Sequence, residues 1–327
     1  MRNRFKALSF PREATIRIAN PASDFSEPVQ QMSLRSIRAY VAVALLTSWV
    51  IQIPAIMIFG LDDPLTTVLF VVVMWSPTVL ALVSMARDRA ARTGVRWRLG
   101  KPWYLPIGII VETGIGFAVL GILLVAGLAT SGWFMFSIDG VTVGGGPWIL
   151  GKGFQGWSLY VLNVLATAIA YSAISLVATV GEEFAWRGFL QGHLEQPLGI
   201  VPAILMVAVV WWAWHLPGLL AGYNFPETPI LGAFVLFPLQ MVGASLLFGW
   251  LTIRAGSFWP AALAHGAVNS IQQGVVGNLQ QHGSALSVDL VRTGLILAAG
   301  LICLPALRAA GAKKAPVGDR PDCEAHR

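Results

Sequence analysis

Two adjacent glutamates lie inside one of the most apolar stretches of this 327-residue chain. Glu182 and Glu183 are followed by Arg187 within the segment Ala178–Leu190, whose other side chains are apolar or small. Charged side chains in a membrane helix cost several kcal/mol unless they are paired or used. An ionisable residue in such a place is therefore a candidate functional residue, and this segment is the first place to look for a site.

Two further motifs follow in later apolar segments. Trp211 is followed four residues later by His215, and His265 is followed four residues later by Asn269. In a helix this spacing puts both ends of a motif on one face. The same spacing predicts that Glu183 pairs with Arg187, whereas Glu182 points about 100° away around the helix and is left for another partner.

These side chains would suffice for hydrolysis of an amide bond. A carboxylate and a neutral imidazole can hold and deprotonate a water molecule. A second imidazole and a carboxamide can donate hydrogen bonds to the oxyanion of a tetrahedral intermediate. One glutamate with two histidines is also a ligand set for a catalytic zinc ion. The chain has no H-E-x-x-H pair, and the sequence leaves open whether the site holds Zn²⁺ or no metal.

The composition predicts helices that cross a membrane as the elements that position these residues. The chain is 56% hydrophobic and 12% charged, whereas soluble domains carry roughly 25% charged residues. We therefore expect an all-α, polytopic membrane protein of about eight transmembrane helices with a catalytic cavity between them. The predicted spans are residues 39–60, 65–86, 103–129, 158–191, 199–222, 230–252, 257–276 and 289–307.

The distribution of charge predicts the orientation. Most basic residues fall in the N-terminal segment, in the stretch from Arg87 to Lys101, at Arg254 and near the C-terminus. By the positive-inside rule these segments are cytoplasmic, so the net charge of +6 is no sign of nucleic-acid binding. We expect a cytoplasmic tail over residues 1–38, a transmembrane domain over 39–307 and a second cytoplasmic tail over 308–327, in a protein of the plasma membrane.

The depth of the motifs predicts a single site. Glu182 lies 16 residues before residue 198, and His215 lies 17 residues after it. At a rise of ~1.5 Å per residue, both are about 25 Å from the turn near residues 196–199, while His265 is about 15 Å from its own turn. The depths agree, just below the cytoplasmic surface, if the tip of the hairpin projects into the cytoplasm. That tip carries Arg187, Gln191, His193 and Glu195.

The three motifs, in this order, resemble those of the CAAX protease and bacteriocin-processing family of intramembrane endopeptidases, which includes the prenyl-protein endopeptidases. The similarity covers about residues 157–275. It implies that Glu182 is the water-activating base and that His215 shares the water. His265 and Asn269 would form the oxyanion hole, and Glu183 and Arg187 the supporting pair. The second motif usually begins with Phe, and the Trp at 211 predicts a modest change in packing.

The resemblance implies an intramembrane endopeptidase whose active site opens to the cytoplasm. Its partners would be membrane lipids and a peptide or protein substrate, such as a lipidated CAAX-type C-terminal tail, a leader peptide or the end of another membrane protein. One alternative is a non-catalytic immunity or scaffold protein of the same fold. A transporter is a second alternative, but the sequence shows neither an inverted repeat nor paired broken helices. Glu112 lies in mid-span outside every motif, and we expect it to be a buried carboxylate bonded to a neighbouring helix.

Overall fold

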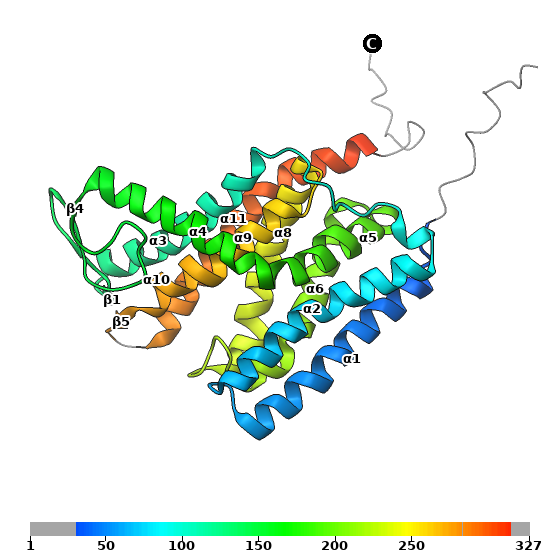
Figure 1. Cartoon of the computed structure of the whole chain (residues 1–327), viewed down its shortest axis with the longest axis horizontal. Helices are drawn as coiled ribbons and strands as arrows, with labels where there is room; N and C mark the ends of the chain where they lie inside the picture. The colour runs from blue at the N-terminus through cyan, green and yellow to red at the C-terminus, as the bar shows by residue number, and fades with distance from the viewer. Residues whose placement is uncertain (1–30, 283, 315–327) are drawn as a thin grey trace, which may run out of the picture.

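The computed structural model describes residues 31–282 and 284–314, and these residues form a bundle of long helices (Figure 1). Most of the two predicted tails lies outside the described residues. The first helix begins at Leu34, where Ser33 caps it by accepting a hydrogen bond from the backbone of Ser36. The predicted all-α class is confirmed.

Most of the described chain is helical. The longer helices are α1 (Leu34–Phe59), α2 (Pro64–Arg87), α3 (Tyr104–Val125), α4 (Trp157–Glu183), α6 (Ile200–Leu220), α8 (Phe237–Ala255) and α11 (Ala285–Lys314). The shorter helices are α5 (Gln191–Leu198), α7 (Pro229–Leu231), α9 (Trp259–Ala267), α10 (Gln273–Gly277) and the 3₁₀ turn η1 (Ala90–Arg92). Three π-helical segments join some of them, η2 (Phe184–Leu190), η3 (Gly232–Leu236) and η4 (Val268–Gln272).

Within the described ranges, seven helices are long and apolar enough to cross a membrane. The longest of these, Trp157–Leu198, runs through α4, η2 and α5 without a break. The remaining predicted span, 257–276, corresponds to the run α9–η4–α10, which is not among the seven. Its polar residues include Asn269, Gln272 and Gln273, and it packs against α3, α4 and α8. In the described part of the chain, α3, α4 and α8 therefore shield a more polar segment.

Small residues allow the closest helix crossings. A Cβ atom built on Gly300 of α11 would lie 2.2 Å from the carbonyl oxygen of Gly243 in α8, and one on Gly266 of α9 would lie 2.7 Å from the carbonyl oxygen of Ser172 in α4. Backbones approach this closely only where side chains are absent, which is how membrane helices gain van der Waals contact.

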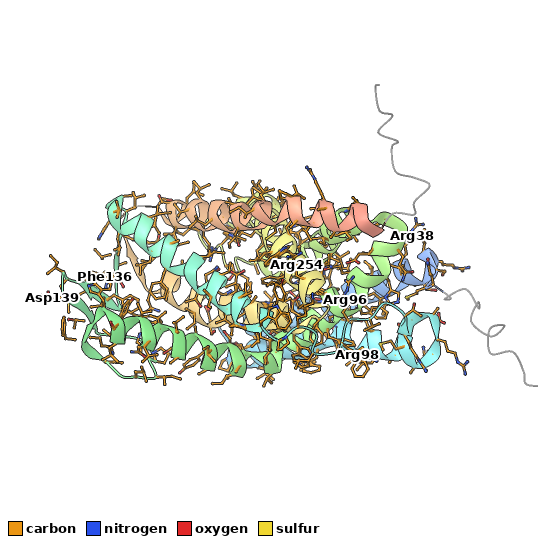
Figure 2. All side chains as sticks on the ribbon, turned by 90° about the horizontal axis from the view of Figure 1, so that it is seen from above. Arg38, Arg96, Arg98, Phe136, Asp139 and Arg254 are labelled. Carbon is orange, nitrogen blue, oxygen red and sulfur yellow. The ribbon has the colours of Figure 1, made fainter. Side chains whose placement is uncertain are left out.

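Short strands cover one end of the bundle. Strand β1 (Ala129–Ser131) pairs with β5 (Leu279–Gln281), with Thr130 opposite Gln280. Strands β2 (Phe134–Phe136), β3 (Gly140–Val143) and β4 (Gly153–Gly156) form an antiparallel sheet in that order. In Figures 1 and 2 this sheet lies at the end of the molecule remote from Arg38.

The two ends of the bundle differ in charge. The end called the basic face here holds the start of α1, the α2–α3 loop, the α5–α6 turn, the α8–α9 turn and the end of α11. Arg38, Arg96, Arg98 and Arg254 lie in or beside these segments, and in Figure 2 all four are remote from Asp139. The turns at the other end, called the opposite face, carry mostly acidic residues. These are Asp62, Asp63, Asp139 and Glu227, and Lys152 is basic.

The hairpin tip does not project from the basic face, contrary to the sequence-based expectation. Arg187, Gln191, His193 and Glu195 are all buried. The α2–α3 loop covers them, because both guanidinium Nη atoms of Arg96 pair with the Glu195 carboxylate. The tip is therefore covered by protein and is not exposed to solvent.

Two glycines of α11 give a matched test of the helix crossing. We expect Gly300→Ala to lower stability by about 1–3 kcal/mol, because the added methyl group overpacks the contact with Gly243. A Cβ atom on Gly294 meets nothing within 4 Å, so Gly294→Ala should be neutral or slightly stabilising. Thermal unfolding of the purified protein in detergent compares the two, and equal unfolding temperatures would contradict the close crossing.

Candidate active site

A buried ion pair forms the floor of the site. The Oε1 atom of Glu183 accepts hydrogen bonds from Nη1 of Arg187 and from Nδ1 of His265, each at 2.9 Å. Nη2 of Arg187 donates to the hydroxyl of Ser245 in α8 at 3.1 Å. Arg187 is 0% exposed, so its charge depends on these partners. The predicted pairing of Glu183 with Arg187 is present in the structure.

The same guanidinium also lies over two aromatic rings. Its central carbon is 4.2 Å from the ring centroid of Trp211 and 5.1 Å from that of Phe248. Cation–π contacts of this kind are worth about 2 kcal/mol or more when desolvated. Arg187 therefore connects η2 with α6 and α8 as well as with Glu183.

Glu182 has a different environment from its neighbour. Its Oε2 atom accepts a hydrogen bond from Nε1 of Trp211 at 2.7 Å. It is only 2% exposed, and among the described residues it forms no ion pair within 4.0 Å. The Trp at 211 is thus more than a change in packing, because its indole holds the carboxylate that was predicted to be the base.

His215 is held through its own helix. Its Nδ1 atom lies 2.9 Å from the carbonyl oxygen of Trp211. A carbonyl oxygen can only accept, so Nδ1 carries the proton and Nε2 is an acceptor in the neutral ring. His215 therefore offers a lone pair rather than a proton to a water molecule beside it.

His265 and Asn269 come from the shielded segment α9–η4. Nδ1 of His265 donates to Glu183, which leaves Nε2 for a ligand. Asn269 lies in η4, one residue after the π-helical segment begins. The segment η2 likewise begins directly after Glu183. Single π-helical turns inside α-helices occur frequently at functional sites.

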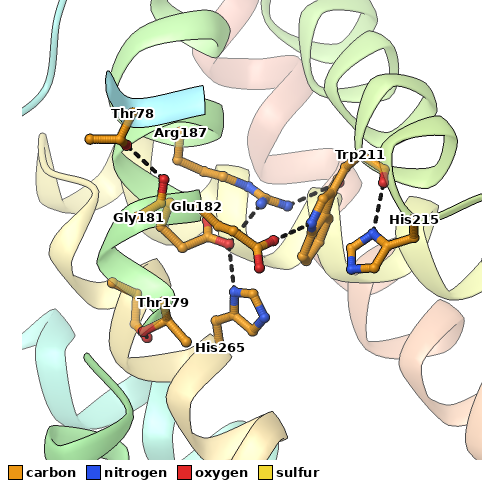
Figure 3. Close-up of polar contacts among 11 residues, drawn as sticks. Thr78, Thr179, Gly181, Glu182, Arg187, Trp211, His215 and His265 are labelled. Carbon is orange, nitrogen blue, oxygen red and sulfur yellow. Dashed lines mark hydrogen bonds and ion pairs between the residues drawn. The ribbon is translucent and has the colours of Figure 1, made fainter. Parts of the chain in front are cut away.

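The predicted residues meet at one cavity of about 150 Å³. Glu182, His215, His265 and Asn269 line it, together with Trp211. Figure 3 shows the glutamate, the tryptophan and both histidines converging on one region, with Arg187 behind them. Glu183 and Arg187 do not line the cavity but close it on the side of the basic face. The structure thus brings all six predicted residues together. Four of them line the cavity, and Glu183 and Arg187 lie behind these four.

Further polar residues line the cavity that no motif predicted. Nε2 of Gln272 donates to Oε2 of Glu112 at 3.1 Å, so Glu112 is bonded to a neighbouring helix as expected, yet both residues also line the cavity. Gln240, Tyr223 and Arg292 line it as well. For Glu112 and Arg292 the sequence carried one signal, a charged residue in an apolar segment. For the other three residues it carried none.

The geometry does not provide a ready metal site. Within the part of the chain that the structure describes, no group of three or more His, Cys, Asp and Glu side chains is placed to hold a metal ion. Nδ1 of both histidines and one oxygen of Glu182 have partners in the protein, which leaves Nε2 of each ring and the second Glu182 oxygen for a ligand. The proposal below routes no step through a metal.

Comparison with known protein families agrees with the motifs. Residues 163–271 match a family model described as type II CAAX prenyl endopeptidase Rce1-like. The motif region of the chain is therefore similar to this Rce1-like family. All six predicted site residues lie inside the matched range, which confirms the resemblance seen in the three motifs. The family is one of membrane proteases. A search of curated proteins found no match to the chain.

The buried pair makes a stability prediction. We expect Arg187→Met to lower the free energy of unfolding by about 3–5 kcal/mol, because it leaves the Glu183 carboxylate buried beside an incomplete set of partners. The double variant Glu183→Gln with Arg187→Met should recover part of this loss, since it removes both charges. Thermal unfolding in detergent measures both, and a single variant as stable as the parent would contradict the central role of the pair.

Proposed function

We propose that this protein is an intramembrane endopeptidase that hydrolyses a peptide bond with a water molecule activated by Glu182 and His215. The observation that carries the proposal is the environment of Glu182. It is a buried carboxylate without an ion-pair partner among the described residues, in a cavity that it shares with two imidazoles and a carboxamide. A residue that is costly to bury and unpaired is a candidate for catalysis.

The first step is attack by water on the substrate carbonyl carbon. The Glu182 oxygen that Trp211 does not bind accepts a proton from the water, and Nε2 of His215 accepts the second hydrogen bond and orients it. The bond between the water oxygen and the carbonyl carbon forms as the proton moves to Glu182. No covalent bond to the enzyme is required.

The second step is collapse of the tetrahedral intermediate. The side-chain amide of Asn269 and Nε2 of His265 donate hydrogen bonds to the oxyanion. For Nε2 to donate, the His265 ring must carry both protons, and the Glu183 carboxylate 2.9 Å from Nδ1 is placed to stabilise that charge. The C–N bond then breaks, and the proton held by Glu182 passes to the leaving amine.

The substrate is a peptide or protein segment, and the family supports CAAX-type C-terminal tails or leader peptides as candidates. We infer from the basic segments that both termini are cytoplasmic, and we expect the plasma membrane as the location. A non-catalytic immunity or scaffold role is the alternative. A non-catalytic protein would not need all six predicted site residues between Glu182 and Asn269, and this chain has all six.

The direct test is cleavage of peptides by the purified protein in detergent. With a panel of fluorogenic prenylated and unprenylated peptides, we expect Glu182→Gln to lower the rate on the order of 10³-fold, within the range typical of a lost general base. Glu227→Gln, at an exposed acidic residue, is the matched control and should retain activity. Cleavage by Glu182→Gln at the parental rate would overturn the mechanism, and loss of cleavage on chelation would reveal a metal.

The Trp211 hydrogen bond makes a second catalytic prediction. We expect Trp211→Phe to lower kcat roughly 10- to 100-fold with little change in KM, because it removes a charge-assisted hydrogen bond worth about 1.5–3 kcal/mol that orients Glu182. Trp212→Phe is the control, since the Trp212 indole donates to the carbonyl of Ala233 and not to Glu182. If the two variants lose activity equally, the indole has no special role in orienting the base.

A further inference from the structure

The cavity is closed toward the basic face by a continuous buried layer. Directly beyond Glu183, the side chains of Trp186, Arg187, Phe189 and Leu190 are at most 1% exposed. This layer belongs to η2 and lies between the catalytic residues and α5. A peptide arriving from the basic face would have to pass through packed core.

The α2–α3 loop covers that layer on the side of the basic face. The backbone N–H of Arg96 donates to the carbonyl of Gly188 at 2.9 Å, and its guanidinium pairs with Glu195. The backbone of the loop also touches the backbone of α5, because a Cβ atom on Gly192 would lie 2.4 Å from the carbonyl oxygen of Gly94. These contacts fasten the loop to the hairpin tip along its length.

Toward the opposite face the lining of the cavity becomes more exposed. Tyr223, in the α6–α7 turn, is 37% exposed, and Asn224, Gln273 and Arg292 are partly exposed. All four line the cavity. Their elements are the α6–α7 turn, α10 and the start of α11, which belong to the opposite face. In Figure 1 the α6–α7 turn lies beside the α1–α2 turn, away from the α2–α3 loop.

The open end is also polar. Nη2 of Arg292 donates to Asp289 at 3.0 Å, whereas its Nε atom is buried without a partner. Deeper in the cavity wall, Nε2 of the buried Gln240 donates to the hydroxyl of the buried Thr293 at 2.9 Å. Convergent polar groups of this kind orient a peptide backbone better than an acyl chain. The open end is therefore suited to a polypeptide.

We propose that the substrate enters the cavity from the opposite face and is a polypeptide segment on the non-cytoplasmic side of the membrane. The positive-inside rule places the basic face in the cytoplasm, so the open end faces away from it. This inference rests on the proposed peptidase function and replaces the cytoplasmic opening expected from the sequence. A lipidated tail that stays in the cytoplasm would not reach Glu182.

The test is the accessibility of single cysteines in the full-length protein in intact cells. In a Cys303→Ala, Cys323→Ala background, Met241→Cys and Gln273→Cys place a thiol in the cavity lining. Asp139→Cys and Arg89→Cys, at exposed residues, report the opposite and the basic face. Leu246→Cys, on the same helix as Met241 but buried outside the cavity lining, is the matched control. The probe is a charged, membrane-impermeant thiosulfonate.

We expect both cavity thiols to react in intact cells together with Asp139→Cys, while Arg89→Cys reacts only after permeabilisation and Leu246→Cys in neither state. Reaction of the cavity thiols only after permeabilisation, or no reaction in either state, would overturn the proposal. This measurement does not depend on catalysis. If the cavity thiols react from outside but the protein cleaves no peptide, the peptidase function is contradicted and the direction of entry is not. If the protein cleaves peptides but the cavity thiols react only from the cytoplasm, the direction of entry is contradicted and the peptidase function is not.

Discussion

The arrangement of the site depends on one buried carboxylate oxygen. Oε1 of Glu183 accepts from both Arg187 and His265, and these contacts join the continuous helix α4–η2 to α9. The guanidinium extends the connection to α8 through Ser245 and to α6 through the ring of Trp211. A buried ion pair stabilises a protein only where further hydrogen bonds complete it. The four segments that carry the site are therefore held in one arrangement.

This constraint gives two neighbouring glutamates opposite roles. Glu183 is held through Oε1 by Arg187 and His265. Glu182 instead turns about 100° away and meets only the Trp211 indole and the cavity. A buried carboxylate without a cation costs stability, which proteins tolerate mainly where function needs it. The difference follows from position on the helix, since the two side chains are chemically identical.

The sequence predicted the parts of this arrangement that depend on local spacing. Four-residue spacing predicted the Glu183–Arg187 pair, and the matching depths of the motifs predicted that His215 and His265 meet at one site. The burial of the hairpin tip was not predictable, because it depends on the pairing of Arg96 with Glu195, which are 99 residues apart in the chain. The hydrogen bond from Trp211 to Glu182 was not predicted. An aromatic residue at this motif position indicates packing, and the sequence does not show that the indole N–H has an acceptor.

The measurement that tests the account most directly compares Glu182→Gln with Glu183→Gln in one protein preparation, by thermal unfolding and by peptide cleavage. The account predicts that Glu182→Gln abolishes cleavage and unfolds at the parental temperature or above it, because an unpaired buried charge is removed. Glu183→Gln should unfold at a clearly lower temperature, because Arg187 and His265 lose their shared acceptor. Equal destabilisation by the two substitutions, or cleavage by the Glu182→Gln variant, would contradict the division of roles between the adjacent carboxylates.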